Sequence, residues 1–233
     1  MKFLLSKLTI FFLLIISFSG KSFSEEFKAI YKIEFGSINI GSLEWIINIE
    51  ADNFKTNMLL KDRGMLSGLY DFSGEYASEG KIFQNKFFSS KYYQFWKTKK
   101  KEREVEISFK ETMVSSLTQR PKEIELPRTK YLDIAGFCDP LASFLNILFN
   151  DKNDFKTIDG RRIYKMSVNN FKKRGNKVSK KILITNYFNL WTDHKKKDLN
   201  FILTEQNLLE KNYFLPKIIK IKNKGLVFKL TKI

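Results

Sequence analysis

Apolar and polar residues alternate along Phe27–Phe35, which places the apolar side chains on one face of an extended segment. The same two-residue period recurs in Ile38–Ile40 and Leu43–Ile49, but its phase changes across Gly41-Ser42. A glycine at such a change of phase is typical of a β-bulge. Periodicity also predicts strands near residues 53–61, 70–79, 81–97, 103–110, 112–119, 162–169, 178–185, 199–206, 216–222 and 226–232. The sequence therefore predicts a mainly β fold, with a large antiparallel sheet that curls or forms a half-open barrel.

Short turn signals separate these predicted strands at Glu79-Gly80-Lys81, Asp159-Gly160 and Asn223-Lys224-Gly225. Asp-Gly is a two-residue hairpin signature, because both residues tolerate the left-handed backbone that tight hairpins require. The segment 120–128, which contains two prolines, is predicted to be a loop or an edge crossing. Hairpins of this kind join neighbouring strands and favour antiparallel pairing.

One segment departs from the strand pattern and predicts a helix of about three turns. Asp139 suits the N-cap position, and Pro140 suits the first helical position. Apolar residues then recur at helical spacing, at Leu141, Phe144, Leu145 and Leu148. We expect this stripe to pack against one face or an open end of the sheet. Because no change of composition marks a boundary, residues 25–233 are predicted to form a single β-rich domain.

The amino terminus has the pattern of a secretory signal. Two lysines in Met1–Lys7 precede the apolar run Leu8–Phe18, which is too short to span a bilayer comfortably. Small residues in Ser22-Phe23-Ser24 predict a cut before Glu25. Residues 1–24 are thus predicted to be a cleavable signal peptide, with an uncleaved membrane anchor as the alternative. The expected location is the periplasm of a Gram-negative bacterium.

Composition narrows the chemistry that such a domain can perform. A single Cys and a single His cannot form an intrachain disulfide or a Cys/His metal cluster, so we expect no metal and no cofactor. The formal charge of +17 comes mainly from lysine, whereas arginine is the usual reader of bases and phosphates in nucleic acid. We therefore expect no nucleic-acid partner, and an anionic envelope surface is the favoured charged partner.

Several short motifs, taken together and in order, resemble a known family. They are Ile40-Gly41-Ser42, the Gly80 turn, Asp139-Pro140 at the start of the helix, Asp159-Gly160 before a strand, and Leu215-Pro216 before the closing hairpin. In this order they resemble the bacterial exported family known as domain of unknown function 3108. The resemblance implies an envelope location and one β-rich domain, and it implies no particular reaction. Its structural motif residues would be Gly41, Gly80, Asp139, Pro140, Asp159, Gly160 and Pro216.

Aromatic residues are the most suggestive functional feature, because large rings fall on both faces of the strand that contains Tyr92-Tyr93 and Phe95-Trp96. They are either filler for a curled sheet or the wall of an apolar cavity. Candidate ligand-lining residues are Trp45, Tyr93, Phe95, Trp96, Leu145 and Phe201. The leading hypothesis is a non-enzymatic envelope protein that binds or carries a hydrophobic component, either a lipid or a lipidated protein.

Two alternatives use charged residues. In the first, an assembly or scaffold protein docks on an anionic membrane surface through lysine-rich hairpin ends, with Lys172, Lys173 and Arg174 as candidates. In the second, a hydrolase uses carboxylates such as Asp71 and Glu75. We assign no catalytic residue, because the chain lacks a nucleophile elbow and a phosphate-binding loop. His194 is expected to be solvated, and Cys138 to be a small buried residue.

Overall fold

The computed structural model describes residues 24–62, 72–130, 133–150, 154–191, 199–210 and 215–233. The strands are β1 (Ser24–Phe35), β2 (Ile38–Glu50), β3 (Asn53–Asp62), β4 (Ser73–Phe83), β5 (Lys86–Lys97), β6 (Glu102–Lys110), β7 (Met113–Arg120), β8 (Asp154–Ile158), β9 (Arg162–Arg174), β10 (Lys177–Asn189), β11 (Leu199–Asn207), β12 (Ile218–Asn223) and β13 (Leu226–Lys232). Helix α2 (Pro140–Phe149) lies between β7 and β8 in the chain. Residues 1–23 lie outside the described residues, so the signal peptide remains a prediction.

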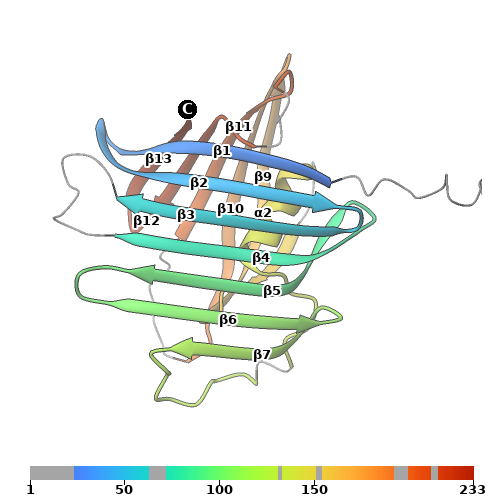
Figure 1. The fold of residues 1–233 in the computed structure, drawn as a ribbon, viewed down its shortest axis with the longest axis vertical. Helices are drawn as coiled ribbons and strands as arrows, with labels where there is room; N and C mark the ends of the chain where they lie inside the picture. The colour runs from blue at the N-terminus through green and yellow to red at the C-terminus, as the bar shows by residue number, and fades with distance from the viewer. Residues whose placement is uncertain (1–23, 63–71, 131–132, 151–153, 192–198, 211–214) are drawn as a thin grey trace, which may run out of the picture.

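All of these strands belong to one 13-stranded antiparallel sheet, in the order β7-β6-β5-β4-β3-β2-β1-β13-β12-β11-β10-β9-β8. Pairing of Tyr31–Phe35 with Phe228–Lys232 joins the N-terminal and C-terminal halves of the sheet. The sheet curls so that β8–β13 run behind and across β1–β7, with α2 between the two halves (Figure 1). No ladder pairs β7 with β8 among the described residues. The predicted curled, half-open sheet with one packed helix is confirmed.

A short segment before the helix bonds to both edges of this open sheet. The Gly136 N–H donates to the Thr112 carbonyl beside β7 at 3.0 Å. Two residues further on, the Cys138 carbonyl accepts from the Ile158 N–H of β8 at 2.9 Å. Edge strands with unpaired backbone groups are prone to aberrant pairing. The segment therefore satisfies part of each edge and holds the two halves together on the open side.

The N-terminus of α2 is tied to the N-terminal half of the sheet. The Asp139 side chain accepts hydrogen bonds from the N–H groups of Leu141 (2.8 Å) and Ala142 (3.0 Å), so the predicted N-cap is confirmed. Its second oxygen accepts from the hydroxyls of Ser78 on β4 (2.7 Å) and Ser89 on β5 (2.5 Å). A buried carboxylate is tolerated only when it is well hydrogen-bonded, which these four donors achieve.

Further along the helix, Asn146 pairs with the backbone of β5 as another strand would. Its Nδ2 donates to the Phe87 carbonyl at 2.8 Å, and its Oδ1 accepts from the Phe87 N–H at 2.9 Å. At the C-terminus of α2, the ammonium of Lys180 on β10 donates to the carbonyls of Ile147 (2.8 Å), Leu148 (3.2 Å) and Asn150 (3.0 Å). A cation at this position satisfies carbonyls that have no partner within the helix. Lys180, which belongs to a lysine-rich stretch of sequence, is therefore a buried helix anchor.

The apolar core fills the space between α2 and the sheet. Phe27, Ala29, Tyr31 and Ile33 are buried as the alternation predicted, whereas Phe35 at the strand end is 40% exposed. The predicted helical stripe is also buried. The residues between its members are buried as well, so that eight consecutive residues, Leu141 to Leu148, lie in the core. A helix buried on all sides is inside the fold rather than on its surface.

The prediction of a bulge at Gly41 is confirmed, whereas the prediction of a turn at Gly80 is wrong. The β1–β2 register shifts where Ile33 pairs with Gly41. Gly80 lies inside β4, and the chain turns instead at Gln84-Asn85, where both residues have positive φ (50° and 58°). Glycine is required at position 80 because a Cβ there would lie 1.9 Å from the Phe88 carbonyl oxygen. A close approach of two backbones and a tight turn produce the same sequence signal.

The predicted turns at 159–160 and 223–225 are confirmed, but the strand before the first one, β8, is absent from the expected set. Only five residues long, β8 offers too short a pattern for periodicity to detect. Asp159 forms the turn by accepting from the N–H groups of Arg161 (3.0 Å) and Arg162 (2.8 Å). Gly160 is needed there because its φ is +90° and a Cβ would lie 2.3 Å from Val105.

We expect Gly80→Ala to lower the free energy of unfolding by about 2–3 kcal/mol, because the added methyl group overlaps a backbone oxygen that cannot move away alone. Gly225→Ala is the control: its φ of +83° is strained for alanine, but no atom lies within 4 Å of the new methyl group. That change should cost about 1 kcal/mol. Urea unfolding measures both, and an equal loss in the two variants would contradict the proposed overlap.

Candidate functional site

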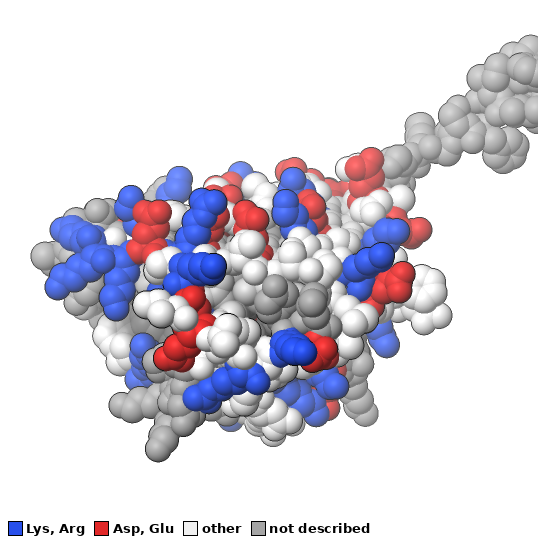
Figure 2. All heavy atoms as spheres, turned by 90° about the horizontal axis from the view of Figure 1, so that it is seen from below, with Lys and Arg blue, Asp and Glu red and all other residues white. Residues whose placement is uncertain are grey.

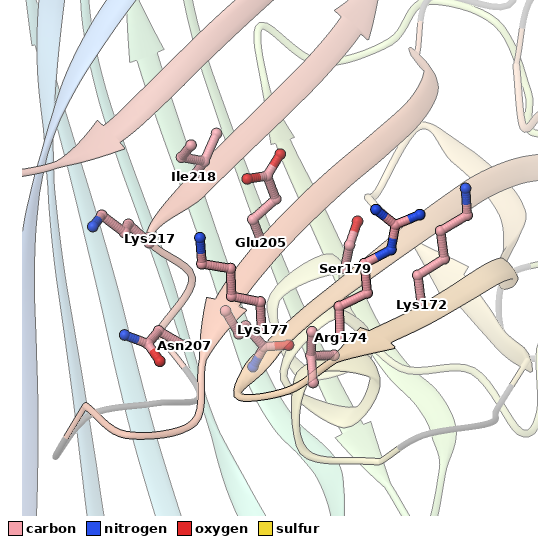
Figure 3. A pocket seen from close by; sticks show the side chains of 10 residues that line it. Lys172, Arg174, Lys177, Ser179, Glu205, Asn207, Lys217 and Ile218 are labelled. Carbon is pink, nitrogen blue, oxygen red and sulfur yellow. The ribbon is translucent and has the colours of Figure 1, made fainter.

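A groove lies near the end of the β9–β10 hairpin, on the face of the sheet that points away from α2 (Figure 3). Its volume is about 590 Å³. Four strands contribute to its wall: β9, β10, β11 and the start of β12. The lining residues are Lys172, Arg174, Lys177, Val178, Ser179, Glu205, Gln206, Asn207, Lys217 and Ile218.

Strand register brings the polar lining residues into two rows across the sheet. In the row nearest the hairpin turn, Lys177 pairs with Arg174 on one side and with Asn207 on the other. In the next row, Ser179 pairs with both Lys172 and Glu205. Successive residues of a strand point to opposite faces, so residues two apart share the groove face.

The same alternation separates the three predicted anionic-surface residues. Lys172 and Arg174 line the groove. Lys173 pairs with Val178, whose side chain is buried on the α2 side of the sheet, and it falls on that other face. The structure thus adds Lys177 and Lys217 to the two groove residues that the sequence identified. The sequence alone could not identify Lys217 as a groove residue, because Lys217 is 43 positions from Arg174 in the chain and only strand pairing brings the two into one groove.

The groove has a local excess of positive charge. Four cationic side chains face one carboxylate, Glu205, along its wall. By contrast, the face seen in Figure 2 carries lysine and arginine side chains interleaved with aspartate and glutamate. Within the described residues, Lys172, Arg174 and Lys177 form none of the ion pairs that the structure contains. Cations without a carboxylate partner are available to an anionic ligand.

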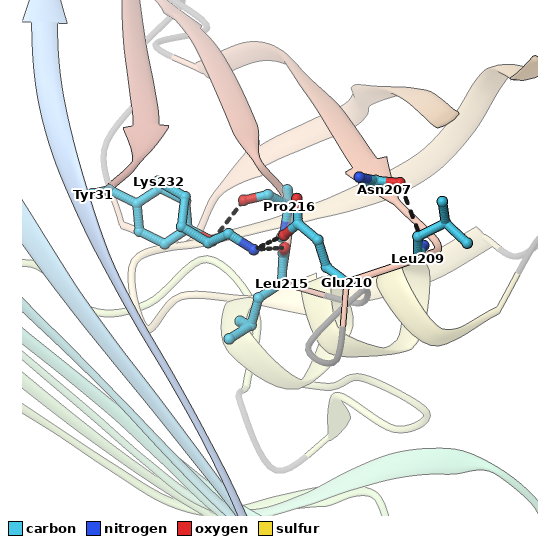
Figure 4. Close-up of polar contacts among 7 residues, drawn as sticks. All are labelled: Tyr31, Asn207, Leu209, Glu210, Leu215, Pro216 and Lys232. Carbon is cyan, nitrogen blue, oxygen red and sulfur yellow. Dashed lines mark hydrogen bonds and ion pairs between the residues drawn. The ribbon is translucent and has the colours of Figure 1, made fainter. Parts of the chain in front are cut away.

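Chain neighbours of the groove residues Asn207 and Lys217 contact the strands β1 and β13 (Figure 4). The Lys232 ammonium pairs with the Glu210 carboxylate, and this hydrogen bond lowers the pKa of Glu210. The buried Tyr31 hydroxyl donates to the Pro216 carbonyl at 2.9 Å, and burial raises the pKa of Tyr31. These contacts hold Glu210 and Pro216, which are close in the chain to Asn207 and Lys217 of the groove.

A second lysine-rich hairpin end, Lys97–Lys101, lies far from the groove along the strands. Neighbouring strands alternate in direction throughout the sheet, so the β5–β6 turn and the β9–β10 turn fall at opposite strand ends. Lys97–Lys101 lies at the β5–β6 turn, and Lys172–Arg174 lies at the β9–β10 turn. Lys195–Lys197 lies outside the described residues. The two described basic ends therefore do not share one rim of the fold.

The six candidate ligand-lining residues divide between the two faces of the sheet. Trp45 and Leu145 are fully buried, and Trp45 stacks on Phe144 with ring centroids 5.7 Å apart. Trp96 is half-buried on the same inner face, opposite Gly74. The remaining three, Tyr93, Phe95 and Phe201, are half-buried on the outer face. There the Lys181 ammonium lies 5.1 Å from the centre of the Phe201 ring. The six do not form one surface.

Of the carboxylates considered for catalysis, Glu75 is exposed on the outer face of β4, and Asp71 lies outside the described residues. His194 also lies outside them. Burial raises the pKa of the Cys138 thiol to about 12, so the thiolate is scarce at neutral pH. In the described part of the chain, no three His, Cys, Asp or Glu side chains gather as metal ligands. Nor does that part hold a helix with the length and hydropathy needed to span a bilayer.

A comparison with known families agrees with the resemblance that the motifs carry. The model of a family described as "Protein of unknown function (DUF3108)" matches residues 30–201. The chain belongs to this family. Among curated proteins, none matches the chain. A solved structure with 7% sequence identity is the crystal structure of a β-barrel-like protein of domain of unknown function DUF1849 from Brucella abortus, with a TM-score of 0.48 over 88% of this chain and 94% of the other.

Within this DUF3108 chain, the motif residues have structural roles. Gly41 is required because a Cβ would lie 2.6 Å from the Lys61 carbonyl oxygen. Asp139 and Pro140 start the helix, and Asp159-Gly160 forms a hairpin turn. Pro216, whose carbonyl accepts from Tyr31, lies beyond the residues that the family model matches. These residues therefore have structural roles in this fold, and none of them lines the groove.

Burial raises the pKa of Asp139 above its ordinary value of 3.8, although four hydrogen bonds act in the opposite direction. The folded protein therefore holds this proton more tightly than the unfolded chain, and its stability falls as the pH rises from 3.8 through the raised pKa. Asp139→Asn removes this titration. The free energy of unfolding of the parent, relative to that of D139N, should decrease over this pH range and then level off. A difference that does not vary with pH would contradict a raised pKa.

Proposed function

We propose that this protein is a non-enzymatic, extracytoplasmic protein that binds the anionic headgroup of an envelope lipid in the β9–β12 groove. The observation that carries this proposal is the cluster of cations that strand register builds on one face from two adjacent rows, Lys172, Arg174 and Lys177, with Lys217 on the facing wall. The predicted signal peptide supports the extracytoplasmic location, because it would carry the chain to the envelope where such lipids are found.

The chemistry of the groove suits a phosphate-bearing headgroup. An arginine guanidinium offers paired donors to phosphate oxygens, and lysine ammonium groups add charge without fixed geometry. Ser179 and Asn207 supply neutral polar groups in the same wall. A volume of about 590 Å³ accommodates a headgroup, although not the length of two acyl chains. Ile218 in the wall and the exposed Leu209 beyond Asn207 provide apolar surface beside the charged site.

The interior of the half-open barrel is a poorer site for a lipid. The inner-face candidates Trp45 and Leu145 are fully buried against other core residues. An acyl chain entering there would displace the Trp45–Phe144 contact and separate α2 from the sheet. Removing such packing costs about 3–5 kcal/mol for a large aromatic residue. The outer groove needs no comparable rearrangement.

The test uses dihexanoyl phosphatidic acid, a soluble short-chain lipid, in titration calorimetry. We expect the double variant Lys172→Glu and Arg174→Glu to bind about tenfold more weakly or worse, because two attractive charges become repulsive. The matched control is Lys99→Glu with Lys100→Glu, which makes the same change in net charge at the opposite strand ends.

That control should bind as the parent does, and the affinity of the parent should fall as salt is added. Equal losses in the two double variants would show a response to overall charge rather than to the groove. Absence of any binding by the parent would overturn the proposal. Dihexanoyl phosphatidylcholine, which carries no net charge, should bind more weakly than the phosphatidic acid.

A further inference from the structure

Two adjacent hairpin turns carry exposed apolar side chains that the groove does not use. β1 pairs with β13, so the β1–β2 turn and the β12–β13 turn lie side by side at the same strand ends. Four large apolar residues at these turns are strongly exposed: Phe35 (40%), Ile38 (49%), Leu226 (48%) and Val227 (43%). We refer to these four residues as the apolar tip.

Phe35, Ile38 and Leu226 lie on one face of the sheet together with Phe228, and Val227 lies on the other face at the same strand ends. Phe35 pairs with Ile38 across the first hairpin and with Phe228 across the β1–β13 ladder. The rings of Phe35 and Phe228 are 5.7 Å apart. Leu226 and Val227 directly precede Phe228 and point to opposite faces of the sheet. Isolated apolar side chains on a surface are ordinary, but a contiguous group at a protruding end marks an interaction site.

The surroundings of the apolar tip are basic. Segments Lys32–Asn39 and Lys220–Lys229 contain lysines at 32, 220, 222, 224 and 229 and a single acidic residue, Glu34. Glu34 already pairs with Lys32 at 2.8 Å and with Lys229 at 3.8 Å. The next strand, β3, ends on Lys61 and Asp62, which add one charge of each sign. The tip therefore lies in a field of net positive charge.

We propose that the apolar tip inserts into the interface of an anionic lipid bilayer. Apolar side chains that project from a basic surface suit this interface, because the rings and branched chains enter the acyl boundary while lysines remain at the headgroups. Each lysine near an anionic surface contributes to the attraction, which weakens with added salt. The lysines favour a lipid surface over a second copy of this chain, since two such tips would repel each other.

The tip and the groove are separate sites. The β9–β10 turn lies at the opposite strand ends from the two tip turns, so a bilayer at the tip leaves the groove away from its surface. The membrane proposal does not rest on the proposed headgroup site, and either can fail alone. If both hold, the protein is anchored at one end and presents a lipid-binding groove at the other.

The first test is co-sedimentation of the purified protein with vesicles of phosphatidylcholine and phosphatidylglycerol. The double variant Phe35→Asp with Leu226→Asp should lower the vesicle partition coefficient about tenfold or more, because both apolar side chains would enter the interface. For a comparison at equal charge, Phe35→Asp alone is set against Phe83→Asp, which replaces a side chain that is 63% exposed at the opposite strand ends. Phe83→Asp should bind vesicles as the parent does, and all of these variants should bind soluble phosphatidic acid like the parent.

A second measurement keeps the proposal testable if the double variant folds poorly. An environment-sensitive fluorophore on Phe35→Cys should shift its emission to the blue when anionic vesicles are added, and the same label on Phe83→Cys should not. The buried Cys138 thiol, with its raised pKa, reacts slowly with the label. Equal behaviour at the two positions would overturn the proposal. So would vesicle binding by F35D/L226D that matches the parent, or a dimer in sedimentation velocity that these substitutions dissociate.

Discussion

The fold depends on polar bonds that hold helix α2 inside the curled sheet. Asp139 and Asn146 attach the helix to β4 and β5 in the N-terminal half. Lys180 and the Ser143–Thr157 hydroxyl pair attach it to β10 and β8 in the C-terminal half. A helix held by apolar contacts alone could rotate or slide, because such contacts have little directionality. These directional bonds fix its depth and rotation, and they therefore set how far the sheet can curl.

The same arrangement explains why the interior is a core and the charged chemistry is outside. Once α2 fills the space between the two halves, inner-face aromatic residues such as Trp45 have neighbours on every side. Cationic side chains are then restricted to the outer face and the strand ends, where water solvates them. Among the described residues Lys180 is the exception, since helix carbonyls solvate its ammonium in place of water. A ligand site that requires no loss of core packing must lie on that outer surface, where the groove is found.

Sequence patterns predicted strands and the helix well where the pattern has a single structural explanation. Alternation identified strands such as β3 and β13 almost to the residue, and Asp139-Pro140 identified the start of α2. The prediction at Gly80 was wrong, because glycine also permits two backbones to approach closely within a strand. Likewise, a run of lysines does not distinguish a solvated side chain at 172 from a buried helix anchor at 180. Only the partners on other elements separate these cases.

The sequence by itself identified the family, and it determined the local conformation, which is short amphipathic strands and a capped helix. These follow from the residue's own backbone preferences and from the side-chain period, which involve near neighbours only. Tertiary structure alone decided that Arg174, Lys177 and Lys217 line one groove, and that Phe35 and Leu226 share one tip. Both sites are assembled across strands by ladder register, and register depends on pairings between residues that are distant in the chain.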